Sequence, residues 1–151
     1  MNNNLDIELL KKIYIKMLIA AVFLLAIVYS GQLLNLLSKK QMDSVRTISI
    51  ILFTLSVIFS IAAPIFLRAA FVNKVKDYKQ VPFNEFITFE KQLLIVVLLA
   101  PFIVVLAVFF NVPSFYLSGI LLIALYAVYY YYPSEKRIKF ERKIFRVKID
   151  S

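Results

Sequence analysis

Four long stretches of apolar residues occupy most of this chain, and they limit the folds available to it. They cover about residues 17–37, 47–67, 93–110 and 115–132. An α-helix rises about 1.5 Å per residue, so a helix of this length crosses roughly 30 Å of hydrocarbon. Hydrophobic residues make up 62% of the sequence, against about 45–50% in soluble domains. The pattern predicts an all-α integral membrane protein whose four transmembrane helices pack as a bundle.

The first apolar stretch also has the outline of a secretory signal peptide. Lysines precede it, and the small residues Ser30 and Gly31 stand near its end. The apolar region of a signal peptide is short, about 7–15 residues, whereas this one continues to Leu37. We therefore expect a retained span rather than a cleaved segment, and a single membrane domain over residues 1–151.

Residues 68–92, the longest connection, have a helical pattern on both sides of a short turn. Apolar residues recur at helical spacing before the turn, at Phe71, Val75 and Tyr78. A second apolar set follows Pro82, which is well placed to begin a helix, at Phe83, Phe86 and Ile87. We expect a helical hairpin that extends spans 2 and 3 beyond the bilayer and packs these two sets together. The alternative is an amphipathic segment that lies flat on the head groups.

Lysine and arginine are distributed unequally around the four stretches. Of the 18 basic residues, 15 lie in the N-terminal segment, the 68–92 connection and the tail, residues 133–151. The other three lie between the first two stretches. Positive residues that flank membrane spans remain mostly cytoplasmic. We therefore expect the cytoplasmic (inner) membrane, with both termini, the hairpin and the basic tail on the cytoplasmic side.

Several residues within the spans are expected to shape helix packing. Small residues share one face of span 2, at Ser49, Ser56, Ser60 and Ala63. Such a face lets a neighbouring helix approach closely, although a polar pathway for a substrate is the alternative. Close-packing positions in span 4 are Ser118, Gly119, Ala124 and Ala127. Pro64 and Pro101 each remove a helical hydrogen bond and should kink their helices.

Ionisable groups fall outside the four stretches, and all nine acidic residues lie in terminal or loop segments. Glu85 and Glu90 stand early in the second arm of the hairpin, where the helix dipole favours acids. Arg68 lies at the boundary of span 2 and is expected to extend its side chain towards the head groups; a phosphate or substrate site is the alternative. The chain has no His or Cys, so the commonest general base and thiolate chemistry are missing. We predict no catalytic, cofactor-binding or metal-binding residue, and no enzymatic activity.

Four consecutive tyrosines, residues 129–132, end the last apolar stretch just before Pro133. Tyrosines at this position are typical of an aromatic belt at the membrane interface. Tyr126, Tyr129 and Tyr130 also share a helix face, so a groove for a ligand or a partner helix is the alternative.

The basic tail fits more than one conformation. As a helix it has apolar residues on two sides rather than in one stripe, and as a strand it alternates well. Ser134 is a candidate helix cap. The simplest interpretation is a solvated topology signal; contact with anionic lipid or strand addition to another protein are the alternatives. Candidate contact residues in the tail are Arg142, Lys143 and Arg146.

These features favour a non-catalytic accessory or scaffold subunit. We expect it to bind other membrane-protein subunits, or a second copy of itself, through its helices and basic cytoplasmic surface. We also expect contact with membrane lipids, including anionic head groups. Topology and lipid explain the net charge of +9, so no nucleic-acid partner is predicted. The alternatives are a small oligomeric transporter or channel and an enzyme acting on lipid head groups.

Overall fold

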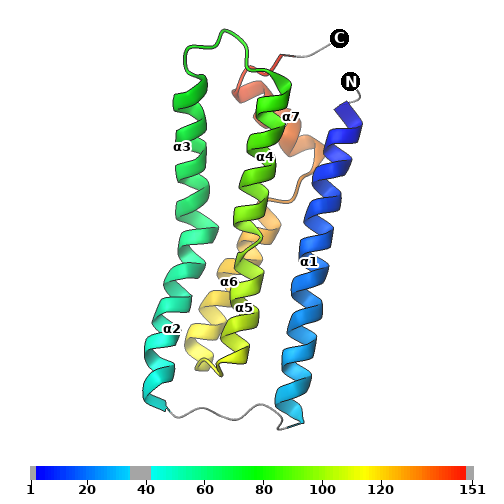
Figure 1. The fold of residues 1–151 in the computed structure, drawn as a ribbon. Coiled ribbons are helices and arrows are strands. Elements are labelled where there is room, and N and C mark those ends of the chain that lie inside the picture. The colour runs from blue at the N-terminus through cyan, green and yellow to red at the C-terminus, as the bar shows by residue number, and fades with distance from the viewer. Residues whose placement is uncertain (1–2, 35–41, 149–151) are drawn as a thin grey trace.

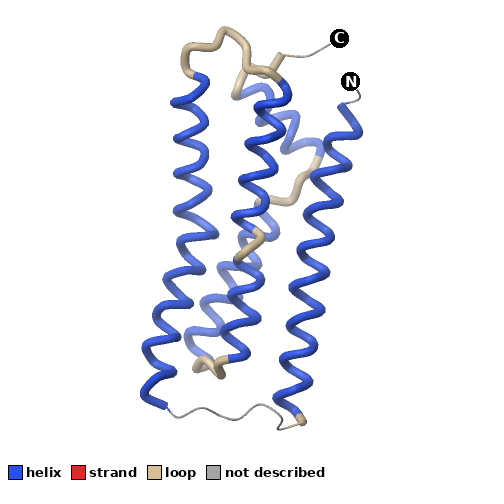
Figure 2. Tube along the Cα trace, viewed as in Figure 1, coloured by secondary structure: helices blue, strands red, loops and turns tan. Residues whose placement is uncertain are grey.

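Every regular element of the described chain is helical. The computed structural model describes residues 3–34 and 42–148 (Figures 1 and 2). Its elements are α1 (Asn3–Leu33), α2 (Met42–Val57), the π-helix η1 (Ile58–Ala62), α3 (Ala63–Val75), α4 (Phe83–Val97), α5 (Ala100–Phe109), α6 (Ser114–Tyr130) and α7 (Glu135–Ile144). The predicted all-α class is confirmed.

Three helical segments are long and apolar enough to cross a membrane. They are Ile7–Leu33, Val45–Val75 and Phe83–Phe109. A fourth is obtained when α6 and α7 are counted as one bent pair, with an angle of 76° between them. These helices extend further than the predicted spans, because the polar turns at their ends continue the helical winding. The chain thus has the several apolar helices of a multi-span membrane protein.

The long helices lie side by side, and the molecule has two distinct ends (Figure 1). The turn between α3 and α4, helix α7 and the described chain ends lie together at one end, which we call the α7 end. The connection between α5 and α6 lies at the opposite end. Between the two ends, α5 packs against α1 and α6, and α2 packs against α6 and α5.

Pro64 and Pro101 stand where the winding of their helices changes, while the predicted kinks stay predictions. Pro64 cannot donate a hydrogen bond to the Ser60 carbonyl, and the residues just before it wind as the π-helix η1. The segment Val45–Val75 nevertheless remains continuous. At Pro101 the effect is stronger, because α4 ends at Val97 and Pro101 lies in the first turn of α5.

The small residues of span 2 lie against neighbouring helices. Ser49, Ser56 and Ser60 are at most 1% exposed, and both α2 and η1 contact α6. Contact there is close, because a Cβ atom added to Gly119 would lie 2.7 Å from Cε2 of the Phe53 ring. The helix-packing interpretation fits these positions. Ser118 was expected to pack as well but is exposed.

One polar side chain near the opposite end also joins two helices. The Gln32 amide on α1 donates a hydrogen bond to the Val108 carbonyl on α5. A side-chain amide within hydrocarbon needs such a partner, since lipid offers none. Residues 35–41 lie outside the described chain, including part of the predicted loop between spans 1 and 2.

The hairpin between spans 2 and 3 forms, but its register differs from the prediction. Phe71 on α3 stacks against Phe89 on α4, with ring centroids 4.3 Å apart. Closer to the turn, Lys74 forms an ion pair with Glu85 at 3.0 Å. Tyr78 does not join this packing and is 43% exposed, because α3 ends at Val75 and the helical spacing ends with it.

Candidate functional site

The basic tail folds into a defined helix at the α7 end. Pro133 follows the end of α6, and the Ser134 hydroxyl then caps α7 by accepting a hydrogen bond from the Arg137 N–H at 3.2 Å. Beyond α7, Arg146 adopts a left-handed backbone with φ 51°. This turn brings Val147 into a parallel bridge with Val81. The predicted cap is confirmed. Residues 134–148 are folded against the hairpin rather than solvated, and their role as a topology signal stays a prediction.

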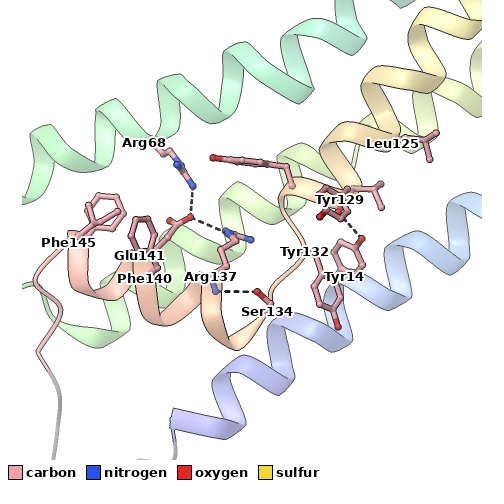
Figure 3. Close-up of a pocket in the computed structure, with 13 residues that line it drawn as sticks. Tyr14, Arg68, Leu125, Tyr129, Tyr132, Ser134, Arg137, Phe140, Glu141 and Phe145 are labelled. Carbon is pink, nitrogen blue, oxygen red and sulfur yellow. Dashed lines mark hydrogen bonds and ion pairs between the residues drawn. The ribbon is translucent and has the colours of Figure 1, made fainter.

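Four charged side chains join α7 to α3 and α4, and we call them the α7 network. Arg137 donates to Glu90 of α4 at 2.6 Å and to Glu141, one helical turn along α7, at 3.2 Å. Glu141 also accepts a hydrogen bond from Arg68 of α3 (Figure 3). The Nη1 group of Arg137 donates a hydrogen bond to the Tyr131 carbonyl at 2.6 Å. Arg137 thus connects α7 to α4 and to the chain just beyond α6.

Three of the four side chains of the α7 network are largely buried. Glu90 is 0% and Glu141 5% exposed, and the Arg137 side chain is 13% exposed. Removing an ion from water costs several kcal/mol unless a counterion and hydrogen bonds replace the hydration. Two arginines and two glutamates supply that compensation. The network is therefore a structural link whose members depend on one another.

Two sequence-based expectations fail at this network. Glu90 lies in the second, helical arm of the hairpin as predicted, but it stands beyond the first turn of α4, and its partner is Arg137 rather than the helix dipole. Arg68 was expected to extend towards the head groups, but its guanidinium turns towards Glu141 on α7. In both cases the partner is a residue of the tail, Arg137 or Glu141. The sequence pattern did not predict where the tail packs.

Tyr131 packs against both arginines of the network. Its ring centroid lies 5.9 Å from the Arg68 guanidinium carbon and 5.6 Å from that of Arg137. The phenol of Tyr131 is neutral at physiological pH, because the ordinary pKa of tyrosine is about 10. A neutral aromatic face attracts a guanidinium by a cation–π interaction. Tyr131 thus contributes to holding the network, unlike the exposed tyrosines on either side of it.

Apolar contacts complete the attachment of the tail. The Phe145 ring lies 5.2 Å from Phe71, 6.2 Å from Phe86 and 5.7 Å from Phe89. Next to it, the Arg142 guanidinium carbon lies 5.0 Å from the Phe83 ring centroid. The hairpin and the tail therefore form one packed unit at the α7 end.

A cavity of about 690 Å³ lies beside the network, and we call it the interface pocket. Helices α1, α3, α6 and α7 supply its walls (Figure 3). Its polar lining includes Tyr14, Arg68, Tyr129, Ser134, Arg137 and Glu141. Two buried atoms of this lining, Arg68 Nε and Glu141 Oε2, have no hydrogen-bond partner among the described residues. Pockets of this size and mixed lining are typical of ligand sites.

The structure separates the predicted contact residues into two groups. Arg68, Tyr129 and Tyr130 all line the interface pocket. Tyr126 stacks on Tyr130 at 5.5 Å without lining the pocket, and Tyr129 is 86% exposed. The second group belongs to the tail: Arg142 packs on Phe83, Lys143 is exposed, and Arg146 forms the left-handed turn.

Tyr14, Arg137 and Glu141 were not among the predicted site residues, and Glu90 was expected only to interact with a helix dipole. One signal was present, because Arg137 and Glu141 stand four residues apart, the spacing of a helical ion pair. Within the described residues, no group of three or more His, Asp or Glu side chains is arranged to hold a metal ion. Comparison with protein-family models, curated proteins and solved structures gives no match for this chain.

Proposed function

We propose that the protein is a four-span helical bundle of the cytoplasmic membrane, with both termini in the cytoplasm. Helix α6 is then the fourth span, because its 17 residues extend about 25 Å. The 76° bend that follows suits a helix that leaves the bilayer and lies along its surface. The excess of lysine and arginine at the α7 end supports the cytoplasmic assignment of that end.

Cysteine labelling tests this topology cleanly, since the chain has no cysteine of its own. We expect Lys79→Cys, in the turn between α3 and α4, to react with a membrane-impermeant maleimide only after the cells are opened. Pro113→Cys, in the turn between α5 and α6, should react in intact cells. Labelling of Lys79→Cys in intact cells would contradict the proposed orientation.

The activity that we propose within this topology is that of a non-catalytic accessory or scaffold subunit. The observation that carries the proposal is that ion pairs hold α7 against α3 and α4 while one of its faces is exposed. Phe140 and Ile144 stand one helical turn apart on that face and are 64% and 57% exposed. Exposed lysines flank them, at positions 136, 139 and 143. A fixed surface of apolar and cationic side chains suits a partner segment that is apolar and acidic.

The chemistry of the buried charges also favours binding over catalysis. Each charged member of the α7 network is engaged in an ion pair with another member. Arg137 joins two elements of the fold through these pairs, so its charge is needed for structure. We infer that the protein acts by presenting the exposed face of α7 to a partner.

Purification from native membranes in mild detergent tests the scaffold proposal. We expect the chain to migrate in a complex larger than its own mass. The variant Lys136→Glu/Lys139→Glu/Lys143→Glu should release the partner by reversing charge on the free face. Its thermal stability should change little, because none of the three lysines belongs to the α7 network and the ion pair of Lys139 with Glu135 is exposed. The variant Lys76→Glu/Lys79→Glu, at the same end but away from α7, is the control and should keep the complex. A free monomer at native expression would refute the proposal.

A further inference from the structure

Two carboxyl groups of the α7 network lie against the same arginine. Nη2 of Arg137 is 2.6 Å from Oε2 of Glu90, and Nε of Arg137 is 3.2 Å from Oε1 of Glu141. These two nitrogens form one edge of the guanidinium, which a single carboxylate commonly occupies with both of its oxygens. Because two carboxyl groups divide this edge, they stand side by side, and a hydrogen bond joins their side chains.

Each of these carboxyl groups has one oxygen that the arginines do not bind. Glu90 Oε1 and Glu141 Oε2 are buried, and no donor among the described residues reaches them. An ionised carboxylate only accepts hydrogen bonds, so a hydrogen bond between the two side chains requires a proton on one of them. One proton between these two oxygens gives both of them a partner.

The surrounding charges determine which carboxyl group holds the proton. Glu141 accepts from both Arg68 and Arg137 (Figure 3), whereas among the described residues Glu90 pairs with Arg137 alone. Glu141 is therefore the better position for the negative charge. We propose that Glu90 and Glu141 form a buried proton-binding site, in which protonated Glu90 donates a hydrogen bond to ionised Glu141. The attachment of α7 to α4 then depends on a bound proton.

Titratable side chains come close to Glu90 from several elements. They are Arg68 of α3, Arg137 and Glu141 of α7, Tyr131 just after α6, and Tyr14 of α1, which packs against Leu94 of α4. The π-helix η1 also contacts α4, and its five residues include no titratable side chain. Both phenols are neutral at physiological pH, so the charges around Glu90 are those of the two arginines and Glu141.

The balance of these effects favours the protonated form of Glu90. Glu90 is 0% exposed and precedes the apolar stretch that begins at about residue 93, so it lies outside the predicted membrane span. Burial raises the pKa of Glu90 to about 8; the charge of Arg137 opposes this rise, and Glu141 adds to it. The folded chain therefore holds the proton at neutral pH.

The bound proton makes stability depend on pH in a defined direction. In the unfolded chain the pKa of a glutamate is about 4.3, so between about pH 5 and 8 the folded state binds one proton more than the unfolded state. Stability must fall as the pH rises through this range and level off above it. The chain has no His or Cys, so no other side chain with an ordinary pKa titrates in this window.

Glu90→Gln tests the proton site in the full chain, because glutamine reproduces the protonated carboxyl group. Its amide can donate to Glu141 and accept from Arg137. Unfolding in mild detergent is measured at about pH 6 and about pH 8. From the lower to the higher pH, the unfolding equilibrium constant of the wild type should rise at least about tenfold relative to that of Glu90→Gln. An equal pH dependence of the two proteins would overturn the proposal.

Infrared spectroscopy detects the proton without reference to stability. At about pH 6 the wild type should show the C=O stretching band of a protonated carboxyl group, and the band should disappear above about pH 9. Glu90→Gln should lack it. Glu85→Gln is the matched control, because Glu85 stands on the same helix and pairs with Lys74 at 3.0 Å; it should keep both the band and the pH dependence of the wild type. A wild type without the band, or a band that persists in Glu90→Gln, would show that Glu90 does not hold the proton.

Discussion

Replacing Arg137 with methionine is expected to destabilise the protein more than any other single change in the tail. The substitution leaves Glu90 fully buried and without its ion-pair partner, and it removes one of the two arginines that bind Glu141. Removing one member of a buried ion pair typically costs about 3–5 kcal/mol. For a chain of this size the midpoint of thermal unfolding should fall by on the order of 10 °C. Unfolding in detergent, followed by loss of helical circular dichroism, measures the effect.

A second substitution should restore most of that loss. In the double variant Glu90→Met/Arg137→Met the unpaired carboxylate is gone, while Arg68 and Glu141 still balance each other. Replacing both members of a buried pair by apolar groups is often neutral or stabilising. Lys136→Met is the control for the loss of a positive charge from α7, because Lys136 is exposed and should change stability little. A double variant as unstable as Arg137→Met alone would show that the ion pair is not the source of the effect.

The positions of the apolar helices were predictable from the sequence for a simple physical reason. Hydrocarbon requires long apolar helices, and this requirement leaves a strong signal in every span. The effect of Pro64 and Pro101 on their helices and the small-residue face of α2 follow from local chemistry too. Helix ends were less predictable, because the polar turns beyond each apolar stretch remain helical in the structure.

The α7 network was not predictable in the same way. Its members stand at positions 68, 90, 137 and 141. They come together only in the folded structure, and no local sequence pattern marks them. The tail was predicted to have no amphipathic stripe, because the search for a stripe counts only apolar residues. The buried side of α7 includes Glu141 beside Ile138. From the sequence alone, a buried charged residue on a helix cannot be distinguished from a solvated one, because its partner is not known.

Phe145→Ala provides the second large effect, and it separates the two interpretations of the tail without changing any charge. Phe145 contacts three aromatic rings of the hairpin, those of Phe71, Phe86 and Phe89. Removing a core phenylalanine costs about 3–5 kcal/mol, and for this partly exposed ring we expect about 2–4 kcal/mol. Since every lysine and arginine remains, charge-determined topology should be unaffected. Thermal unfolding and the Lys79→Cys labelling assay measure the two properties separately.

The neighbouring phenylalanine of α7 gives a matched control for this prediction. Phe140 is 64% exposed, and Phe140→Ala should leave the unfolding midpoint almost unchanged. A tail that served only as a charged topology signal would tolerate both substitutions equally, because neither alters its charge. A tail that holds the hairpin in place must respond to Phe145→Ala alone. Equal stability of the two variants would therefore restore the interpretation of the tail as a solvated topology signal.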